Sequence, residues 1–275
     1  MKKLIFTFIL SFLIGASLFT YASGNNEGIV VFSNDDVVFR QIDAHTWVGS
    51  GNQMFQESLY LLEGNERAIL IDAGTNIKDL DKIVASITSK PVTLVATHVH
   101  PDHTGPSIDC FPEIWINPGD TVLIPSFMGN YPGAVHSLQD GEILDLGGRQ
   151  LEVVFTPGHT PGSTTFIDRE AGYGFSGDSF GSSLLLLTVD FSTFIATCEM
   201  ITAKMEADGI NYLFPGHYNN DNEEKIEKLR EMQQLSERVL SGEVKSKPNP
   251  DNTFGLKLAV DGNGFRIIFN ESAIK

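Results

Sequence analysis

Metal-binding side chains crowd into one short stretch of this chain. His98, His100, Asp102 and His103 fall within six residues, in the pattern His-x-His-x-Asp-His. Neutral imidazole nitrogens and a carboxylate oxygen suit a borderline divalent cation such as zinc. Residues two apart on an extended backbone share a face, so His98 and His100 can reach the same ion. Pro101 ends the extended run, which lets the next two side chains turn toward a second ion.

Three further candidate ligands follow later apolar segments. They are His159, Asp178 and His217, and each comes directly after a glycine. A glycine permits a sharp loop that exposes the next side chain, and loops at strand ends commonly carry binding residues. Because the chain has only seven histidines, the repetition of one local design favours a shared site over scattered surface residues.

The elements that precede the first motif are expected to place it at an accessible edge of a sheet. The hydrophobic pattern predicts a hairpin, then an amphipathic helix whose start is capped by Thr75 or Asn76, then an apolar strand. These elements are expected at residues 58–63, 67–72, 77–89 and 91–96. The motif therefore follows the carboxyl end of a strand, where sites of α/β proteins commonly lie.

Alternating and helical periodicities continue through the rest of the chain. Strands are expected at residues 29–32, 37–42, 46–48, 114–116, 121–124, 142–146, 151–155, 165–168, 173–176, 212–214, 256–260 and 265–269, and helices at 190–208 and 223–240. Residues 126–140 have weak secondary-structure signal and many apolar and aromatic side chains, so we interpret them as a pocket wall. The pattern predicts an α/β protein with mixed sheets.

Composition narrows the class of protein. The chain of 275 residues is 41% hydrophobic, so it can bury a sizeable core, and no linker divides residues 25–275, which we expect to form one domain. The formal net charge of −16 disfavours nucleic acid and anionic lipid as partners. We therefore expect a small-molecule substrate.

The first 24 residues resemble a secretory signal peptide. A basic start at Lys2 and Lys3 precedes an apolar run over residues 4–19, and small residues near Ala22 or Gly24 offer a cleavage site. An uncleaved membrane anchor is the alternative, although the run is short for a span. We expect an exported protein, periplasmic or secreted, without stable membrane insertion after cleavage. Cys110 and Cys198 lie far apart, and we expect both to be free.

The ordered ligand set resembles that of the metallo-β-lactamase superfamily. The resemblance rests on the motif at residues 98–103, on the three later ligands, and on Ile71-Asp72-Ala73-Gly74, which is similar to an upstream motif of that superfamily. It covers about residues 39–217. It implies a four-layer αβ/βα sandwich, with the site in a cleft at one edge of the sheets.

The resemblance also implies a role for each ligand. His98, His100 and His159 would hold a first metal, and Asp102, His103 and His217 a second. Asp178 would bridge the two, and Asp72 would orient a ligand histidine by a hydrogen bond. Two zinc ions are expected, with iron or manganese as alternatives. Asp102 and Asp178 are also the candidates for moving a proton during catalysis.

The chemistry implied is hydrolysis by a metal-bridging hydroxide, because a metal lowers the pKa of bound water to about 7. The bridging Asp178 departs from the zinc β-lactamases, so an ester, lactone or thioester is the favoured substrate, as in lactonases and glyoxalase II-like thioesterases. A zinc β-lactamase, a mononuclear iron sulfur dioxygenase and a non-enzymatic metal-binding protein remain alternatives.

Apolar and aromatic residues near the motifs are candidates for a substrate pocket. They are Phe55, Phe127, Met128, Tyr131, His136 and Tyr218. Ordinary core packing is the alternative for each of them. We expect His45 to be structural, and Ser176 and Ser179 to be loop residues rather than nucleophiles.

Overall fold

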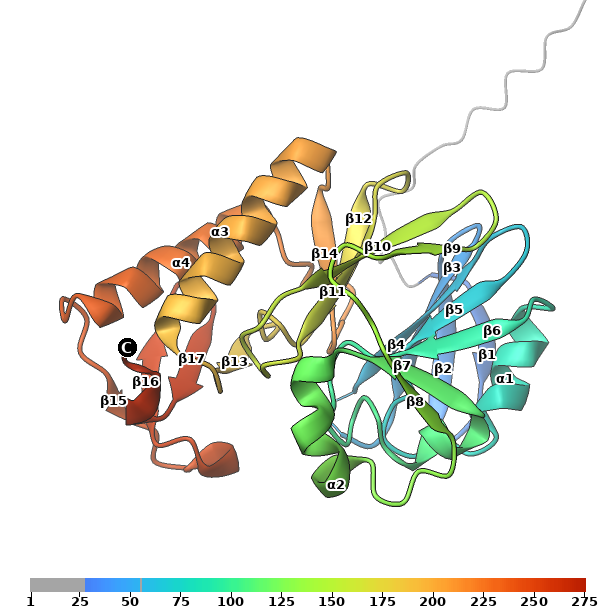
Figure 1. Cartoon of the computed structure of the whole chain (residues 1–275), viewed down its shortest axis with the longest axis horizontal. Helices are drawn as coiled ribbons and strands as arrows, with labels where there is room; N and C mark the ends of the chain where they lie inside the picture. Colours follow the sequence, from blue (N-terminus) through green and yellow to red (C-terminus); the bar gives the residue numbers. More distant parts are fainter. Residues whose placement is uncertain (1–27, 55) are drawn as a thin grey trace, which may run out of the picture.

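The computed structural model describes residues 28–54 and 56–275, so the predicted signal peptide and Phe55 lie outside the described residues. Its strands form three sheets (Figure 1). The strands are β1 (Val30–Ser33), β2 (Val37–Asp43), β3 (Thr46–Gly51), β4 (Ser58–Glu63), β5 (Ala68–Ile71), β6 (Val92–Val95), β7 (Glu113–Ile116), β8 (Ala134–Ser137), β9 (Ile143–Asp145), β10 (Gln150–Phe155), β11 (Thr164–Asp168), β12 (Tyr173–Gly177), β13 (Leu184–Leu186), β14 (Tyr212–Pro215), β15 (Lys247–Pro248), β16 (Leu258–Asp261) and β17 (Arg266–Phe269).

Helical segments lie on the outer faces of these sheets or between strands. The α-helices are α1 (Leu80–Ile87), α2 (Ile124–Phe127), α3 (Phe191–Asp208) and α4 (Ile226–Leu240), and the 3₁₀ helices are η1 (Pro106–Cys110), η2 (Pro118–Leu123), η3 (Thr253–Gly255) and η4 (Glu271–Ala273). Among the described residues, no helix combines the length and the apolar character that crossing a membrane requires.

The first sheet is mixed and contains β1 to β8 in chain order. β1 to β5 are antiparallel neighbours, whereas β5 to β8 run parallel. The parallel part follows from the crossover helix α1, whose Leu80, Ile83 and Val84 are buried against the sheet. The predicted strand–helix–strand unit is therefore confirmed, although the helix begins at Leu80 rather than at residue 77 because Asp79 has a left-handed backbone (φ 54°).

The second sheet has the order β14-β12-β11-β10-β9, and a smaller third sheet has the order β13-β17-β16-β15. Apolar side chains of the first and second sheets pack together in one core around Tyr60, Phe166 and Phe175. A separate core joins the second and third sheets to α3 and α4, around Phe191 and Phe194. Helix, sheet, sheet and helix thus succeed one another (Figure 1), which confirms the αβ/βα sandwich with mixed sheets.

Residues 121–124 form helical turns, not the predicted strand. The β-branched Val122 and Ile124 suggested a strand, but the local start signals are helical. The Asn117 side chain accepts a hydrogen bond from the Gly119 amide at 2.9 Å, and Pro118 occupies the first helical position. A capping side chain followed by proline favours a helical turn.

Other departures are shorter. The strands β8, β13 and β15 were not expected, and each has four residues or fewer. α4 begins at Ile226 rather than at residue 223, because the backbone of Glu224 pairs with Leu213 at the end of the second sheet. The prediction of two free cysteines is confirmed, with Cys110 partly buried and Cys198 fully buried.

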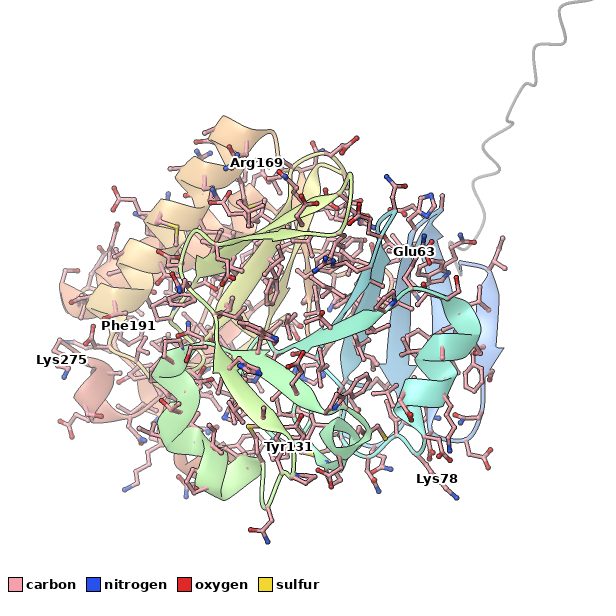
Figure 2. The ribbon with its side chains drawn as sticks, turned by 45° about the vertical axis from the view of Figure 1, so that its right-hand side comes forward. Glu63, Lys78, Tyr131, Arg169, Phe191 and Lys275 are labelled. Carbon is pink, nitrogen blue, oxygen red and sulfur yellow. The ribbon has the colours of Figure 1, made fainter. Side chains whose placement is uncertain are left out.

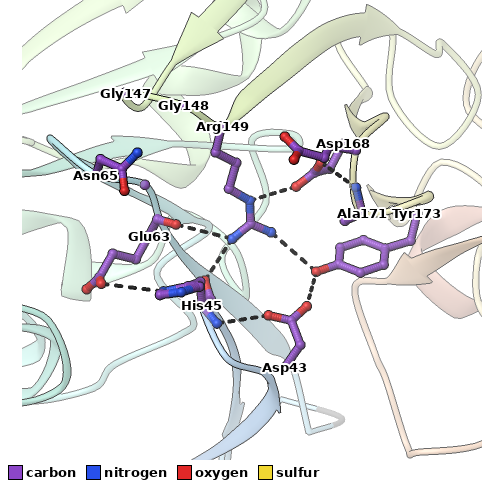
Figure 3. A pocket seen from close by; sticks show the side chains of 12 residues that line it. Asp43, His45, Glu63, Asn65, Gly147, Gly148, Arg149, Asp168, Ala171 and Tyr173 are labelled. Atoms are coloured by element: carbon purple, nitrogen blue, oxygen red, sulfur yellow. Dashed lines mark hydrogen bonds and ion pairs between the residues drawn. The ribbon is translucent and has the colours of Figure 1, made fainter.

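Arg149 fastens the two large sheets together at one end of the sandwich (Figure 3). Its guanidinium donates to the Asp168 carboxylate at 2.7 Å, the His45 carbonyl at 2.7 Å and the Thr46 hydroxyl at 2.8 Å. It also lies 3.3 Å from the hydroxyl of Tyr173, which donates to Asp43. The network uses the backbone carbonyl of His45, whose side chain is mostly exposed and lies 3.7 Å from Glu63. These residues surround a small cavity of about 250 Å³. Figure 2 shows Glu63 and Arg169 toward this end and Tyr131 toward the other.

Candidate metal centre

The predicted ligands meet at the end of the sandwich opposite to Arg149. β5 and β6 of the first sheet, and β10, β12 and β14 of the second, all run toward this end. The loops after β6, β10, β12 and β14 carry the seven predicted ligands, and the loop after β5 carries Asp72. Alignment of strand ends is therefore what brings together residues that lie more than 100 positions apart in the chain.

His98, His100 and His159 form the first cluster. Nδ1 of His100 lies 3.1 Å from Nε2 of His98 and 2.8 Å from Nε2 of His159. The opposite nitrogens are held by the protein: Nδ1 of His159 contacts the Leu186 carbonyl at 3.0 Å, and Nδ1 of His98 contacts the Thr97 hydroxyl at 3.1 Å. Each of these two rings therefore turns its other nitrogen toward the centre of the cluster.

Asp102, His103, Asp178 and His217 form the second cluster. Nε2 of His217 lies 3.5 Å from Oδ2 of Asp102 and 3.4 Å from Oδ2 of Asp178. Nε2 of His103 lies 3.7 Å from each of the same two oxygens. Two imidazoles and two carboxylates thus converge on one small volume.

The Asp178 carboxylate lies between the two clusters. Its Oδ2 atom is 3.8 Å from Nε2 of His159 in the first cluster and 3.7 and 3.4 Å from Nε2 of His103 and His217 in the second. Gly177, at the end of β12, aims this side chain: its backbone is left-handed (φ 53°), and a Cβ there would lie 2.5 Å from Cβ of Thr97. Glycine is the residue that accommodates both constraints.

Asp72 orients His103, as the resemblance implied. Its Oδ2 atom accepts from Nδ1 of His103 at 2.8 Å and from the Thr97 hydroxyl at 2.8 Å, and its Oδ1 atom accepts from the Thr97 amide at 2.7 Å. A histidine whose Nδ1 donates to a carboxylate presents Nε2 as a ligand. That Nε2 atom is buried and has no hydrogen-bond partner among the described residues.

The two clusters differ in protonation. Burial, followed by repulsion from neighbouring histidines, holds the pKa of His98 well below its usual value and lowers the pKa of His100 to about 3. Burial likewise lowers the pKa of His159. These imidazoles are neutral at pH 7, the form that binds metals.

The second cluster is a set of ion pairs. Burial acts against the charged form of His217, yet Asp178 and then Asp102 raise its pKa to about 10. The pKa of His103 also lies well above its usual value, because Asp102 and Asp72 outweigh burial. In turn, His217 and His103 overcome burial and hold the pKa of Asp178 well below its usual range.

The donor set fits two divalent cations. Buried polar atoms are almost always paired in folded proteins, but Nε2 of His103 and Oδ1 of Asp178 are buried without a hydrogen-bond partner among the described residues. Three neutral imidazoles can serve one ion, and two imidazoles with two carboxylates another. The chemistry of these donors therefore fits the binding of divalent metals.

Asp120 is a buried carboxylate at this end that sequence reasoning missed. It accepts hydrogen bonds from the Val99 amide at 2.9 Å, the Thr160 hydroxyl at 2.8 Å and the Gly162 amide at 2.7 Å. It lies in η2, directly before residues 121–124, which were expected to form a strand. An Asn-Pro-Gly-Asp sequence between two ligand motifs was the available signal.

The expected pocket residues separate into different environments. The Phe127 ring stands perpendicular to His100 with centroids 5.1 Å apart, so it borders the first cluster. Met128 is buried in the core behind it, and the Tyr131 hydroxyl donates to the Phe111 carbonyl at 3.0 Å. His136 instead lies on the edge strand β8, where it stacks on Trp115 and contacts Glu113. The Tyr218 hydroxyl donates to Glu223 at 2.9 Å.

Known proteins share this arrangement. The family model described as "Metallo-beta-lactamase superfamily" matches residues 53–242, which include every predicted ligand. The chain belongs to the metallo-β-lactamase superfamily. This membership confirms the resemblance drawn from the ligand pattern, and it makes the chain a member of a superfamily of metal-dependent hydrolases.

Curated and solved members of the superfamily extend the comparison. The human acyl-coenzyme A thioesterase MBLAC2 is 27% identical over 236 residues, covering 68% of this chain and 85% of the relative. Hydroxyacylglutathione hydrolase GloC of Haemophilus influenzae is 31% identical over 142 residues, covering 45% and 66%. The structure of a metallo-β-lactamase from Pontibacter korlensis superposes with a TM-score of 0.59 at 19% identity, covering 74% of this chain and 99% of that one. The structural likeness supports the fold.

Proposed function

We propose that this protein is a two-metal hydrolase of thioesters, within the wider class of ester, lactone and thioester substrates. The observation that carries the proposal is the position of Asp178, whose carboxylate faces histidines of both clusters at 3.4 to 3.8 Å. A shared carboxylate fits a pair of neighbouring ions better than it fits one ion. Zinc is the metal we propose, because the ligands are mainly imidazole nitrogens.

The protein's own residues would divide the work. His98, His100 and His159 would hold one ion, and Asp102, His103 and His217 the other, with Asp178 between them. Bound divalent metals supply Lewis acidity and bring water near a pKa of about 7. Asp102 and Asp178 have lowered pKa values, so both are ionised at neutral pH, the form that binds a metal. Their place beside the proposed ions is what makes them the candidates for moving a proton. Asp72 holds His103 in orientation.

The nearby serines support hydrolysis by water rather than by a protein nucleophile. The Ser176 hydroxyl donates to Glu224 at 2.7 Å, and the Ser179 hydroxyl contacts that of Thr156 at 2.9 Å. Both are fully buried. Ser176 lies in β12, so its prediction as a loop residue is wrong, whereas Ser179 does lie in the loop after that strand. The contacts of both hydroxyls favour structural roles over nucleophilic ones.

Two relatives favour thioesters over the other acyl substrates. One is named as an acyl-coenzyme A thioesterase and the other as a hydroxyacylglutathione hydrolase, so both names describe cleavage of an acyl group from a thiol carrier. The aromatic ring of Phe127 beside His100 offers an apolar contact for an acyl group. We also propose export, on the strength of the amino-terminal sequence.

A substrate panel tests the proposal. Purified protein, loaded with zinc, is assayed against acyl thioesters, lactones, β-lactams and phosphodiesters, with and without a chelator. We expect thioester turnover that the chelator abolishes and that zinc restores. Absence of chelator-sensitive turnover of every substrate would overturn the proposal, and turnover of β-lactams alone would replace it with the antibiotic-hydrolysing alternative.

Metal analysis of the same protein, purified without added metal, distinguishes the proposed hydrolase from an iron-dependent sulfur dioxygenase. Two zinc ions per chain agree with the proposed hydrolase. One iron per chain together with oxygen consumption would instead favour a sulfur dioxygenase.

A further inference from the structure

Asp120 connects the two segments that carry the first cluster. Val99, whose amide donates to Oδ2 of Asp120, lies between His98 and His100. Thr160, whose hydroxyl donates to the same oxygen, follows His159, and the Gly162 amide donates to Oδ1. One carboxylate therefore joins the loop after β6 to the loop after β10, and all three histidines of the first cluster lie on those loops.

The tie is rigid because the carboxylate is buried and closely packed. Asp120 is fully buried, and a buried carboxylate is costly unless donors surround it. Three donors do so here. Gly162 approaches so closely that a Cβ at that position would lie 2.6 Å from Oδ1 of Asp120. The Asp120 side chain thus helps to fix the relative position of the two loops, and Gly162 permits the close approach because it has no Cβ.

The second cluster is supported by other residues. Asp72 holds His103. The loop that carries Asp178 is held through Ser176 and Ser182, which both donate to the buried Glu224. The contacts of Asp120 are made by Val99, Thr160 and Gly162, which lie beside ligands of the three-histidine cluster. Asp102 and His103 lie further along the same loop as Val99, but His103 is held separately by Asp72. A change at Asp120 is therefore expected to act mainly on the three-histidine cluster.

We propose that Asp120 is a positioning residue that sets the metal affinity of the first cluster without touching the ion. The inference rests on the proposed two-metal function, because it requires an ion at that cluster. Removing a residue that hydrogen-bonds directly to a metal ligand commonly costs roughly 10- to 100-fold in metal affinity, which is an upper range for Asp120 because it acts through residues next to the ligands. We expect a loss in this range for Asp120→Ala and a smaller loss for Asp120→Asn, which keeps one oxygen.

The test is competition for zinc between the protein and a chromophoric chelator, together with the thermal unfolding of the metal-free form. Asp168→Asn is the matched control, because Asp168 is an equally buried carboxylate at the Arg149 end of the same sandwich. Both substitutions are expected to lower the Tm of the metal-free protein. Only the Asp120 variants are expected to lose zinc affinity, in one of two binding steps.

The same substitutions in a His98→Ala variant test whether the weakened zinc-binding step belongs to the first cluster. His98→Ala removes a ligand of that cluster and leaves the four-residue cluster intact. In this background Asp120→Asn is expected to change the affinity of the remaining zinc by less than about twofold, whereas a loss as large as in the unaltered background would overturn the proposal. Thr160→Val deletes a single donor and is expected to produce a smaller loss of the same kind, which keeps the test open where Asp120→Ala does not fold.

The outcomes separate the two proposals. An unaltered protein that binds two zinc ions, with Asp120 variants that bind them equally well, would overturn the role of Asp120 and leave the proposed function standing. An unaltered protein that binds no zinc at either cluster would overturn both.

Discussion

Single residues decide how protons and metals compete for the second cluster. The pKa of His217 is raised to about 10, and that of His103 lies well above its usual value, so both are protonated in the metal-free protein at pH 7. Each must lose its proton to bind a metal. The three histidines of the first cluster have lowered pKa values and are already neutral.

We predict that zinc binding to the second cluster releases about two protons per ion at pH 7 and tightens as pH rises. The stability of the metal-free protein is expected to change with pH in the opposite direction, falling as pH rises. Because the pKa of His217 rises from 6.5 to about 10 on folding, its ion pairs stabilise the protein fully below about pH 6.5 and are lost as pH approaches 10. Proton release in weakly buffered indicator solution measures the effect, and zinc uptake without release would contradict it.

Phe127 and His136 make a matched pair for testing the pocket. Phe127 borders His100, whereas His136 contacts Glu113 and Trp115 on an edge strand. Phe127→Ala is expected to lower kcat/KM for apolar acyl thioesters by about tenfold, the loss of a buried aromatic contact of about 1.4 kcal/mol. His136→Ala is expected to change it less than about twofold. A larger effect at His136 would restore it to the pocket.

Residue types and spacings predicted the ligands well. The His-x-His-x-Asp-His motif and the three later ligands that each follow a glycine at a strand end are local signals, and all seven residues came together. Asp120 was missed because its partners are backbone amides and a hydroxyl on loops distant in the chain. The residues next to Asp120 in the sequence do not indicate such contacts, because the partners come from other parts of the chain. The contact of His136 with Glu113 on the adjacent strand is likewise absent from the local sequence, and a role for His136 in the pocket stays a prediction.

At the scale of elements, the end of β12 has a restrictive backbone. Gly177 and Gly209 both have left-handed backbones, with φ of 53° and 69°. A Cβ at Gly177 would collide with Thr97, whereas a Cβ at Gly209 would meet nothing within 4 Å. The two glycines therefore share the conformational cost of an alanine substitution and differ in the steric cost.

Gly177→Ala is expected to destabilise the protein by about 3 kcal/mol and to reduce zinc content, because it displaces the loop that carries Asp178. Gly209→Ala is expected to cost about 1 kcal/mol, the backbone strain alone, with full zinc content. Chemical denaturation and metal analysis of both variants measure these effects. Equal zinc content in the two would show that the turn does not position Asp178.

Long periodic elements were predictable, and short ones were not. α3 and α4 and the central hairpins carry many apolar positions in register, so their patterns are strong. β13 and β15 have two or three residues and form only because β16 and β17 offer edges for pairing. In η2, the cap at Asn117 and the proline outweighed the strand preference of Val122, which is 75% exposed and packs little.

In the whole molecule, the polar network that joins the two large sheets and the predicted metal ligands lie at opposite ends of the sandwich. Arg149 joins the two large sheets at one end (Figure 3), and the ligands gather at the other, where β6, β10, β12 and β14 end. Its side chain is only 13% exposed, and Asp168 is buried beneath it. Removing one partner of a buried ion pair leaves the other charge uncompensated.

Arg149→Leu is therefore expected to lower the free energy of unfolding by about 3 kcal/mol. The double variant Arg149→Leu with Asp168→Leu is expected to recover part of this loss, since no buried charge then remains unpaired. Both variants are expected to keep two zinc ions per chain. Loss of metal in either one would show that the two ends of the sandwich are coupled.

The spread of the ligands along the chain has a consequence for when the protein acquires its metal. The first motif begins at His98, but the second cluster is complete only once His217 arrives with β14, after both large sheets have formed. A chain cannot assemble that cluster before His217 has emerged from the ribosome, and neither can a chain that crosses a membrane unfolded. The supply of ions in the compartment where folding finishes, rather than where translation begins, then determines which metal the protein carries.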